Sequence, residues 1–487
     1  MRNFAALLGA SARAHAERPA VVWRDGTLTH RALQRRAGGF ARFLDGSGVR
    51  PGDRVALSIP NGWSFAAAFL GTLELGAVAA PLDPRLTEDE RRAILDDLRP
   101  RLVVDHVKGD DAEGPTVSES GGPALILYTS GSTGRPKGAV LSHDALSFAV
   151  RSWAEPVMAL TPDDRVLGVL PFSHSYGLNG ALLAPLLAGG AVVTLERFVP
   201  DDVLDAVTAH RVTVLPAVAT MFSRLLGSPA LDRGRLGSVR MALSGAAPCP
   251  WDLACEWRER TGVRIFRGYG STELFRPLSY LAADAADRPD AIGRPVPGVE
   301  VRVVDEDGRP LSAGESGELL ILTPAAMDGY LGAPDETREV LVDGWFRTGD
   351  LARVTAEGWV TIEGRKRERI LRGGYSVFPQ EVEAVLLGHP AVGEAAVVGV
   401  PHDELGEEVA AFVALRQGER ADPDELIAHC KGKLAAFKYP RQVTIVPELP
   451  KAPTGKILKK LLGGGLRSPS DGRHAPDGAF LPASPQE

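Results

Sequence analysis

The sequence has little cysteine: three residues among 487, with no pair at CxxC spacing. An odd number without metal-ligand spacing predicts neither a disulfide framework nor a structural zinc site, and is typical of a reducing cytoplasm. The three are Cys249, Cys255 and Cys430.

An excess of basic residues is also missing. Lysine and arginine total 55 against 62 acidic residues, a formal charge of −7. This charge gives no electrostatic reason to expect nucleic acid or an anionic membrane as partner. With 44% apolar residues the chain has enough material for a large core. Small-molecule chemistry is the favoured class of function.

No hydrophobic run is long enough to cross a membrane, which takes about 20 apolar residues. The longest uncharged run, 166–195, is interrupted by Pro171, Asn179, Pro185 and a Gly-Gly pair, so we expect buried core. The opening "MRNFAALLGASARA" is similar to a short export signal, but its apolar residues also fit one helix face. We expect a helix of a cytoplasmic protein.

Short β-branched runs alternate with Ala/Leu-rich stretches between about 20 and 320, which indicates βα units and a largely parallel sheet. From about 293, "VEVRVVDEDGRPL" and "GWVTIEGR" alternate apolar and polar residues around DG and EG turns. This pattern predicts antiparallel hairpins, forming a small β-barrel. The predicted strands are "AVVW" (20–23), "RVALSIP" (54–60), "AVVTL" (191–195), "VTVLP" (212–216) and "VRIF" (263–266).

A charged, glycine-rich run, "GRKRERILRGGY" (364–375), is either a solvated loop or a linker between domains. A separate α+β pattern follows it. Pro379 at a helix start, Gly388 just past its end, and the Asp422/Glu425 capping box mark two helices. We therefore predict an α/β N-terminal domain over 1–366, a small mobile α+β domain over 367–463, and a disordered tail over 464–487.

The loop "YTSGSTGRPKG" (128–138) follows the apolar run "ALIL". Glycines, hydroxyls and one lysine behind a strand suit a polyphosphate. A Walker loop is excluded because Pro136 stands where that motif needs glycine. A flexible surface loop is the alternative.

This loop resembles the signature of the adenylate-forming superfamily, which includes acyl-CoA and aryl-CoA synthetases. Four further motifs follow in the family's order, and the similarity covers about 15 to 462. They are "GYGSTE" (268–273), "TGD" (348–350), "GRKRERILRGGYSVFPQEVE" (364–383) and "PKAPTGK" (450–456).

The resemblance implies an AMP-forming acid–thiol ligase. Such an enzyme joins a carboxylic acid to AMP from ATP with Mg²⁺, releases pyrophosphate, and passes the acyl group to coenzyme A by domain alternation. A carrier-protein thiol or an amine is the alternative acceptor. A nucleotide-binding module without catalysis is a third reading, which the intact motifs disfavour.

By resemblance, Lys137 and its loop hold the β- and γ-phosphates, Thr272 contacts the α-phosphate, and Glu273 binds Mg²⁺. Without the resemblance, "STE" could equally be a helix N-cap. The residues of the loop expected at the phosphates are Thr129, Ser130, Gly131, Ser132, Thr133 and Gly134.

Asp350 is expected to accept hydrogen bonds from both ribose hydroxyls, supported by Arg365, because a carboxylate accepts two bonds and donates none. By resemblance, "SGAAP" (244–248) forms the wall against which adenine lies, although an ordinary turn would also explain it. Tyr269 is expected to stack on the base. The remaining predicted nucleotide contacts are Gly245, Ala246, Ala247, Gly270 and Ser271.

The family places Lys456 against the carboxylate and α-phosphate, although composition alone favours a surface lysine. Arg367 falls at the hinge, where relatives usually carry Asp or Lys. Gly373 and Gly374 are expected to line the coenzyme A tunnel, where glycines let a thiol arm pass close to the backbone.

His174 in "PFSHSYG" matches the family's histidine beside the acyl channel, although a core histidine is the alternative. The predicted pocket favours a neutral hydrophobic or aromatic acid, while Arg267 and Arg276 keep a dicarboxylate possible. Whether the protein is a monomer or a homodimer is left open. The other predicted pocket residues are Phe172, Tyr176, Met221, Gly268 and Leu274.

Overall fold

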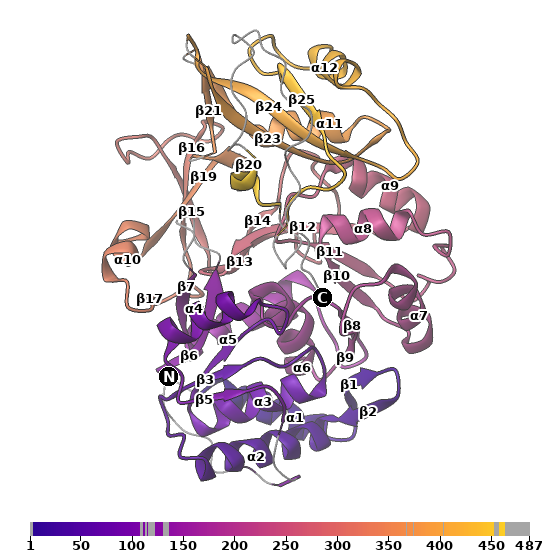
Figure 1. Cartoon of the computed structure of the whole chain (residues 1–487). Helices are drawn as coiled ribbons and strands as arrows, with labels where there is room; N and C mark the ends of the chain where they lie inside the picture. The colour runs from indigo at the N-terminus through magenta and orange to yellow at the C-terminus, as the bar shows by residue number, and fades with distance from the viewer. Residues whose placement is uncertain are drawn as a thin grey trace. The chain divides into compact units, whose positions relative to one another are not determined.

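The computed structural model describes residues 3–107, 111–112, 114, 122–129, 136–366, 368–373, 375–402, 404–451 and 457–462. The chain folds into two compact units, of which the first ends at Glu363 and the second begins at Gly364. Figure 1 follows the chain through both units by colour.

A nine-stranded sheet of the first unit has the order β14-β13-β12-β11-β10-β8-β9-β1-β2. Its centre, from β12 to β1, is parallel, and both edges are antiparallel. The strands are β1 (Pro19–Trp23), β2 (Gly26–Thr29), β8 (Arg165–Gly168), β9 (Ala191–Thr194), β10 (Val214–Ala217), β11 (Met241–Ser244), β12 (Ile265–Ser271), β13 (Phe275–Ser279) and β14 (Arg294–Pro295).

A six-stranded sheet has the order β17-β7-β6-β4-β3-β5, and an antiparallel sheet has the order β15-β16-β19-β18 with β20 beside β19. The α/β class is confirmed, while closure of the antiparallel sheet into a barrel stays a prediction. The strands are β3 (Arg54–Leu57), β4 (Val78–Pro81), β5 (Leu102–Val104), β6 (Pro123–Thr129), β7 (Lys137–Ser142), β15 (Glu300–Val304), β16 (Gly317–Leu322), β17 (Gly329–Tyr330), β18 (Leu341–Val342), β19 (Trp345–Val354) and β20 (Val360–Arg365).

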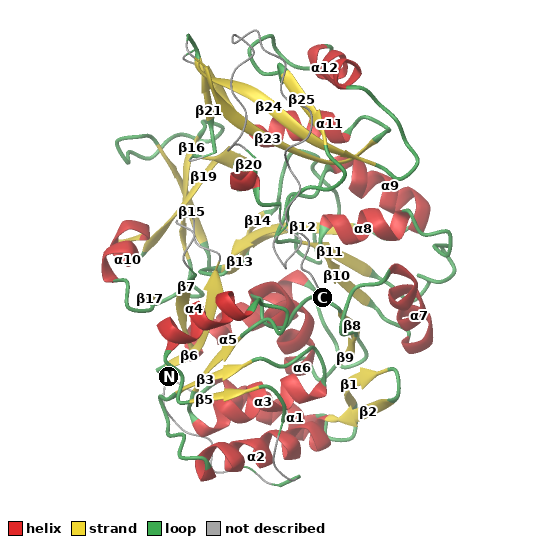
Figure 2. Ribbon diagram, in the orientation of Figure 1, coloured by secondary structure: helices red, strands yellow, loops and turns green. Residues whose placement is uncertain are grey.

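Helices alternate with these strands along the chain (Figure 2), as the βα pattern predicts. Among the described residues, no helix combines the length and the apolarity that crossing a bilayer requires. The helices of the first unit are α1 (Phe4–Ala14), α2 (His30–Gly46), α3 (Trp63–Leu75), α4 (Glu88–Leu98), α5 (His143–Ser152), α6 (Ala184–Leu187), α7 (Pro200–His210), α8 (Ala219–Leu226), α9 (Trp251–Thr261) and α10 (Pro334–Val340), with the π-helices η1 (Trp153–Val157) and η2 (Gly177–Leu183).

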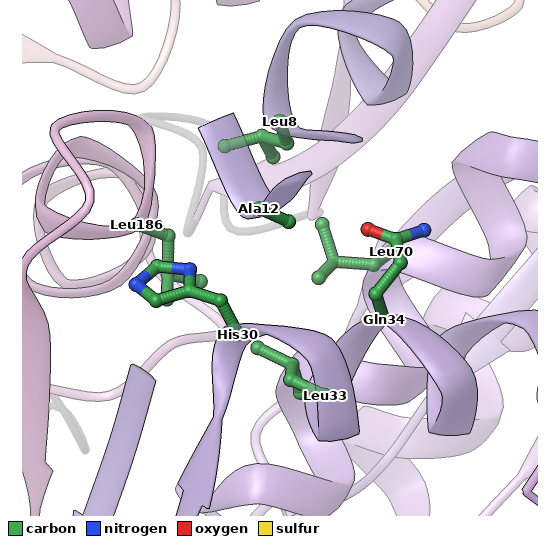
Figure 3. Close-up of a pocket in the computed structure, with 7 residues that line it drawn as sticks. All are labelled: Leu8, Ala12, His30, Leu33, Gln34, Leu70 and Leu186. Atoms are coloured by element: carbon green, nitrogen blue, oxygen red, sulfur yellow. The ribbon is translucent and has the colours of Figure 1, made fainter. Parts of the chain in front are cut away.

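The chain opening forms helix α1, as predicted. The Asn3 side chain accepts from the N–H of Ala5 and donates to the carbonyl of Leu73 at 2.7 Å, so it caps α1 and ties it to α3. Phe4 and Leu8, one turn apart, are buried in the main core. A small cavity of about 10 Å³ lies beside α1, with room for about one water (Figure 3).

The second unit has an antiparallel sheet, β22-β21-β24-β23, with β25 added in parallel to β24. Its helices begin as predicted: Pro379 is the first residue of α11, and Asp422 accepts from the N–H of Glu425 at 2.8 Å. The elements are β21 (Ile370–Arg372), β22 (Tyr375–Val377), α11 (Pro379–Leu387), β23 (Val392–His402), β24 (Gly406–Leu415), α12 (Pro423–Lys431), β25 (Gln442–Ile445) and the 3-10 helix η3 (Lys459–Leu461).

Strands β12 and β13 form the hairpin on which much of the predicted site lies. It tightens at Gly270, where an added Cβ would stand 1.8 Å from the carbonyl oxygen of Phe275. Phe275 itself has a left-handed φ of 55°. Only glycine permits this approach, so the loop Thr272 to Leu274 is held at a fixed tip.

We predict that Gly270→Ala lowers the free energy of unfolding by about 3 kcal/mol, because the methyl group has no space without moving the backbone. Denaturant unfolding measures this change. The matched control is Gly46→Ala at the end of α2, where the added Cβ meets no atom within 4 Å. An effect at Gly270 no larger than at Gly46 would contradict the close approach.

Glu74 is a buried carboxyl on α3, 3% exposed, which accepts a hydrogen bond from the Gln34 side chain at 2.5 Å. Burial raises its pKa to about 7, and the bond from Gln34 opposes that shift. Folding therefore favours the protonated form. Its stabilising effect is complete below the unfolded pKa near 4.5 and is lost as pH rises through about 7.

We predict that Glu74→Gln raises the free energy of unfolding at pH 8 by about 3 kcal/mol, since each pKa unit corresponds to about 1.4 kcal/mol. The advantage should disappear below pH 4.5. Denaturant unfolding at pH 4.5 and pH 8 measures the change in unfolding free energy at each pH. If Glu74→Gln lowers the stability at pH 8, the charged carboxylate is favourable at this buried position and the prediction is wrong.

Candidate active site

Lys137, Tyr330 and Glu273 form a charged cluster in the first unit. The Tyr330 hydroxyl donates to Oε1 of Glu273 at 2.9 Å, and Nζ of Lys137 lies 5.3 Å from the centre of the Tyr330 ring. Lys137 also pairs with Glu336 on α10. Burial first, then the nearby Glu273 carboxylate, raises the pKa of Tyr330, which stays a neutral donor. The structure thus brings the predicted phosphate lysine close to the predicted metal carboxylate.

Long-range strand pairing makes this cluster. β17 pairs with β7, placing Tyr330 opposite Ala139, two residues from Lys137. The backbone N–H of Met327 donates to the carbonyl of Glu273 and holds the hairpin tip near β17. Sequence reasoning missed Tyr330 and Glu336, since neither lies in a recognised motif.

The loop after β6 is only partly described. Thr129 ends β6 and pairs with Lys137 at the start of β7, so the two residues flank the loop. The predicted loop contacts Ser130, Gly131, Ser132, Thr133 and Gly134 lie outside the described residues.

Two of the residues predicted to bind adenosine, Tyr269 and Asp350, are in contact. The Tyr269 hydroxyl donates to Oδ2 of Asp350, which is only 5% exposed. The Thr348 hydroxyl accepts from the N–H of Asp350 at 3.0 Å, fixing the turn that carries it. Gly245 is buried after β11, and Ala246 has a left-handed φ of 64°. A strained non-glycine residue in this turn fits a functional position.

His174 faces a carboxylate that sequence reasoning also missed. Its Nε2 atom is buried without a hydrogen-bond partner and lies 3.8 Å from Oδ2 of Asp83. Burial lowers the pKa of His174, so the neutral ring is favoured at neutral pH. Burial alone would raise the pKa of Asp83, but hydrogen bonds from Arg85 outweigh it and lower that pKa. A neutral imidazole beside an oriented carboxylate can accept or donate one hydrogen bond to a substrate.

The predicted acyl-pocket residues have different surroundings. Tyr176 donates to the carbonyls of Leu243 and Ala217, at 2.9 and 3.3 Å. Gly268 lies against Arg276. The others are apolar: Phe172 is buried against Phe65, Leu274 is fully buried in the main core, and Met221 is partly buried on α8.

In the second unit, Arg365 ends β20 and is exposed, and the N–H of Gly373 donates to the carbonyl of Leu405 at 2.8 Å. Gly373 has a left-handed φ of 56°. The predicted Arg367, Gly374 and Lys456 lie outside the described residues.

A magnesium ion fits the donor set near Glu273. Among the described residues, no group of three or more His, Cys, Asp or Glu side chains could hold a metal by itself. Mg²⁺ commonly takes one or two carboxylates and completes its shell with phosphate oxygens and water. The Glu273 carboxylate is a group of this kind, and its Oε1 accepts from the Tyr330 hydroxyl.

Two protein-family models match the chain. The family model described as AMP-binding enzyme matches residues 8–120 and 105–331, and that of the AMP-binding enzyme C-terminal domain matches residues 381–456. The two matches together span most of the chain.

Two relatives and one solved structure illustrate the similarity. Feruloyl-CoA synthase of an Amycolatopsis species is 36% identical, covering 89% of this chain and 92% of the relative. Sulfoacetate–CoA ligase of Cupriavidus necator is 34% identical, and the match covers 94% of this chain and 97% of the relative. The solved structure of ATP-bound MatB from Rhodopseudomonas palustris is 33% identical, with a TM-score of 0.87. The match covers 94% of this chain and 98% of that chain. The chain belongs to the AMP-binding enzymes of the adenylate-forming superfamily and is similar to their acyl- and aryl-CoA synthetases.

Proposed function

We propose that the protein is an ATP-dependent acid–thiol ligase that converts a carboxylic acid to an acyl-adenylate and then to a thioester of coenzyme A. The observation that carries the proposal is the convergence of Lys137 and Glu273 on Tyr330. A triphosphate and its Mg²⁺ need a cation and a carboxylate near each other, and this cluster supplies both.

The first step brings two anions together. The substrate carboxylate attacks the α-phosphorus of ATP, a P–O bond forms, and pyrophosphate leaves with its electron pair. Lys137 would stabilise the charge on the departing phosphates, and Glu273 would hold a Mg²⁺ ion, which would offset the negative charge of the phosphates. Thr272 at the hairpin tip donates to the α-phosphate, and Lys456 contacts the carboxylate.

Tyr269 and Asp350 orient the nucleoside. Asp350 is buried, and its own backbone N–H donates to the Thr348 hydroxyl, so its carboxylate is positioned to accept from the ribose hydroxyls. In the second step the coenzyme A thiolate attacks the acyl carbon and AMP leaves. Gly373 and Gly374 line the thiol path, after movement of the C-terminal domain about Arg367.

Coenzyme A is the favoured acceptor because the compared relatives are named as CoA synthases or ligases. Their names do not choose the acid. Feruloyl-CoA synthase is named for an aromatic acid, and sulfoacetate–CoA ligase for a short acid with a second anionic group.

We predict that acid, ATP and Mg²⁺ give an acyl-AMP detectable by mass spectrometry, and that Lys456→Ala slows its formation about 100-fold. Conversion of preformed acyl-AMP to the thioester should change little, since that lysine acts on the first step. The control is Lys451→Ala, which removes a lysine paired with Glu394 in the same segment. Full-speed adenylation by Lys456→Ala would contradict the mechanism.

The pairing of Lys137 with Glu336 generates another prediction, because ATP phosphates must replace the Glu336 carboxylate. Glu336→Gln should lower the KM for ATP by up to about fivefold, since a partly exposed ion pair is worth up to about 1 kcal/mol. Steady-state kinetics test this, with Glu339→Gln on the same helix as control. A higher KM would mean that Glu336 supports the binding conformation of Lys137.

A further inference from the structure

Arg276 lies on β13, 8% exposed, at the carboxyl ends of the parallel strands. Its guanidinium donates to the carbonyl of Ser244, the last residue of β11, at 3.2 Å, and to that of Phe266 in β12 at 3.3 Å. A third N–H donates to the Ser279 hydroxyl at 3.1 Å. Ligands of α/β proteins bind at this edge of a sheet.

The same guanidinium is enclosed by aromatic rings. It lies 4.7 Å from the centre of the Trp153 ring and 5.9 Å from that of Tyr176, and these two rings stack on each other. Tyr176 donates to carbonyls of β10 and β11. Arg276 and Tyr176 therefore lie together over neighbouring strand ends, inside the predicted acyl pocket.

The Arg276 side chain occupies space that is open only because two predicted site residues are glycines. A Cβ on Gly268 would lie 2.3 Å from Cζ of Arg276, and one on Gly245 would lie 3.0 Å from its Nη1. A predominantly apolar pocket would instead place an aliphatic or aromatic side chain here. The guanidinium thus makes this part of the pocket polar.

The charge of Arg276 is not matched within the described part of the chain. Its acceptors are neutral and lie at 3.1 to 3.3 Å, the long end of hydrogen bonding. Other arginines of this unit form salt bridges with carboxylates: Arg240 pairs with Asp164, and Arg264 pairs with Asp287. Burying an unpaired charge is costly, and a bound anion would offset that cost.

Arg267, on the adjacent strand, has a different environment. It is also buried and also has only neutral acceptors, the carbonyls of Pro289 and Arg288 at 2.8 and 2.6 Å and the Tyr280 hydroxyl at 3.3 Å, and its Nε is buried without a partner among the described residues. The two arginines therefore differ in position rather than in charge compensation. Of the two arginines that kept a dicarboxylate possible, only Arg276 lies against predicted pocket residues.

We propose that the acid carries a second anionic group, a carboxylate or sulfonate, which Arg276 binds. A guanidinium suits this role because its planar fork matches two anionic oxygens. Arg276 is four residues from Thr272, so their backbones are at most about 14 Å apart, which favours a short acid. This inference rests on the proposed function and replaces the expectation of a neutral acid.

The test measures acyl-AMP formation by the full-length protein with malonate, succinate and sulfoacetate. The comparison acids are monomethyl malonate and monomethyl succinate, which lack the second charge, and ferulate and benzoate. At least one dianion should exceed its monoester in kcat/KM by about 100-fold, as expected when a buried polar group loses its partner. Preference for ferulate, benzoate or the monoesters would overturn the role of Arg276.

Arg276→Met should reduce this ratio to near one by lowering kcat/KM for the dianion, and Arg276→Lys should give an intermediate ratio. The control, Arg267→Met, removes a buried arginine of similar size and should leave the ratio unchanged. Equal losses for dianions and monoesters in Arg276→Met would assign it a structural role only. If that variant does not fold, the wild-type ratio still decides.

The experiment distinguishes failure of the Arg276 proposal from failure of the proposed ligase function. Acyl-AMP formed only from neutral aromatic acids contradicts the role of Arg276 and leaves the ligase function standing. No acid-dependent acyl-AMP from any acid of the panel contradicts the ligase function itself.

Discussion

Repulsion between a carboxylate and a triphosphate is the constraint that this protein has to overcome. Coulomb energy between like charges is large where water is excluded, so positive groups and dipoles must be in place before the anions meet. The described residues show part of the answer: Lys137 lies over the Tyr330 ring, and the Tyr330 hydroxyl binds Glu273. Tyr330 is thus a neutral residue that lies against both charged side chains.

The β12–β13 hairpin carries residues that we propose for nucleotide binding together with the arginine that we propose for the acid. Within eight residues it carries Tyr269 toward Asp350, Glu273 toward Tyr330, and Arg276 toward the ends of the parallel strands. Its shape depends on the contact between Gly270 and the carbonyl of Phe275. A small backbone shift there would move all three side chains together, which explains why the tightest approach of the hairpin lies at its centre.

The surroundings of His174 and Arg276 suit the two different roles that we propose for them. His174 is favoured in its neutral form by burial and faces a carboxylate that Arg85 keeps charged. Arg276 stays cationic because a guanidinium does not deprotonate in proteins. A neutral hydrogen-bonding ring suits the reacting end of the acid, where charge changes during the reaction, and a permanent cation suits an end whose charge does not change.

The local sequence determined much of this protein. Strand runs such as "AVVW" and "VTVLP" became strands, Pro379 and Asp422 began helices, and five ordered motifs placed the chain in its family. Strands, helix starts and motifs depend on residues that are close together in the chain, so their spacing can be read directly from the sequence. Tertiary structure alone decided that Tyr330 reaches Glu273, that Glu336 pairs with Lys137 and that Asp83 faces His174. It also decided that Arg276 lies against Gly245, Gly268 and Tyr176, whereas Arg267 donates to the carbonyls of Pro289 and Arg288. These contacts come from strand pairings and loop packing between distant segments, and no local pattern encodes which side chains such pairings bring together.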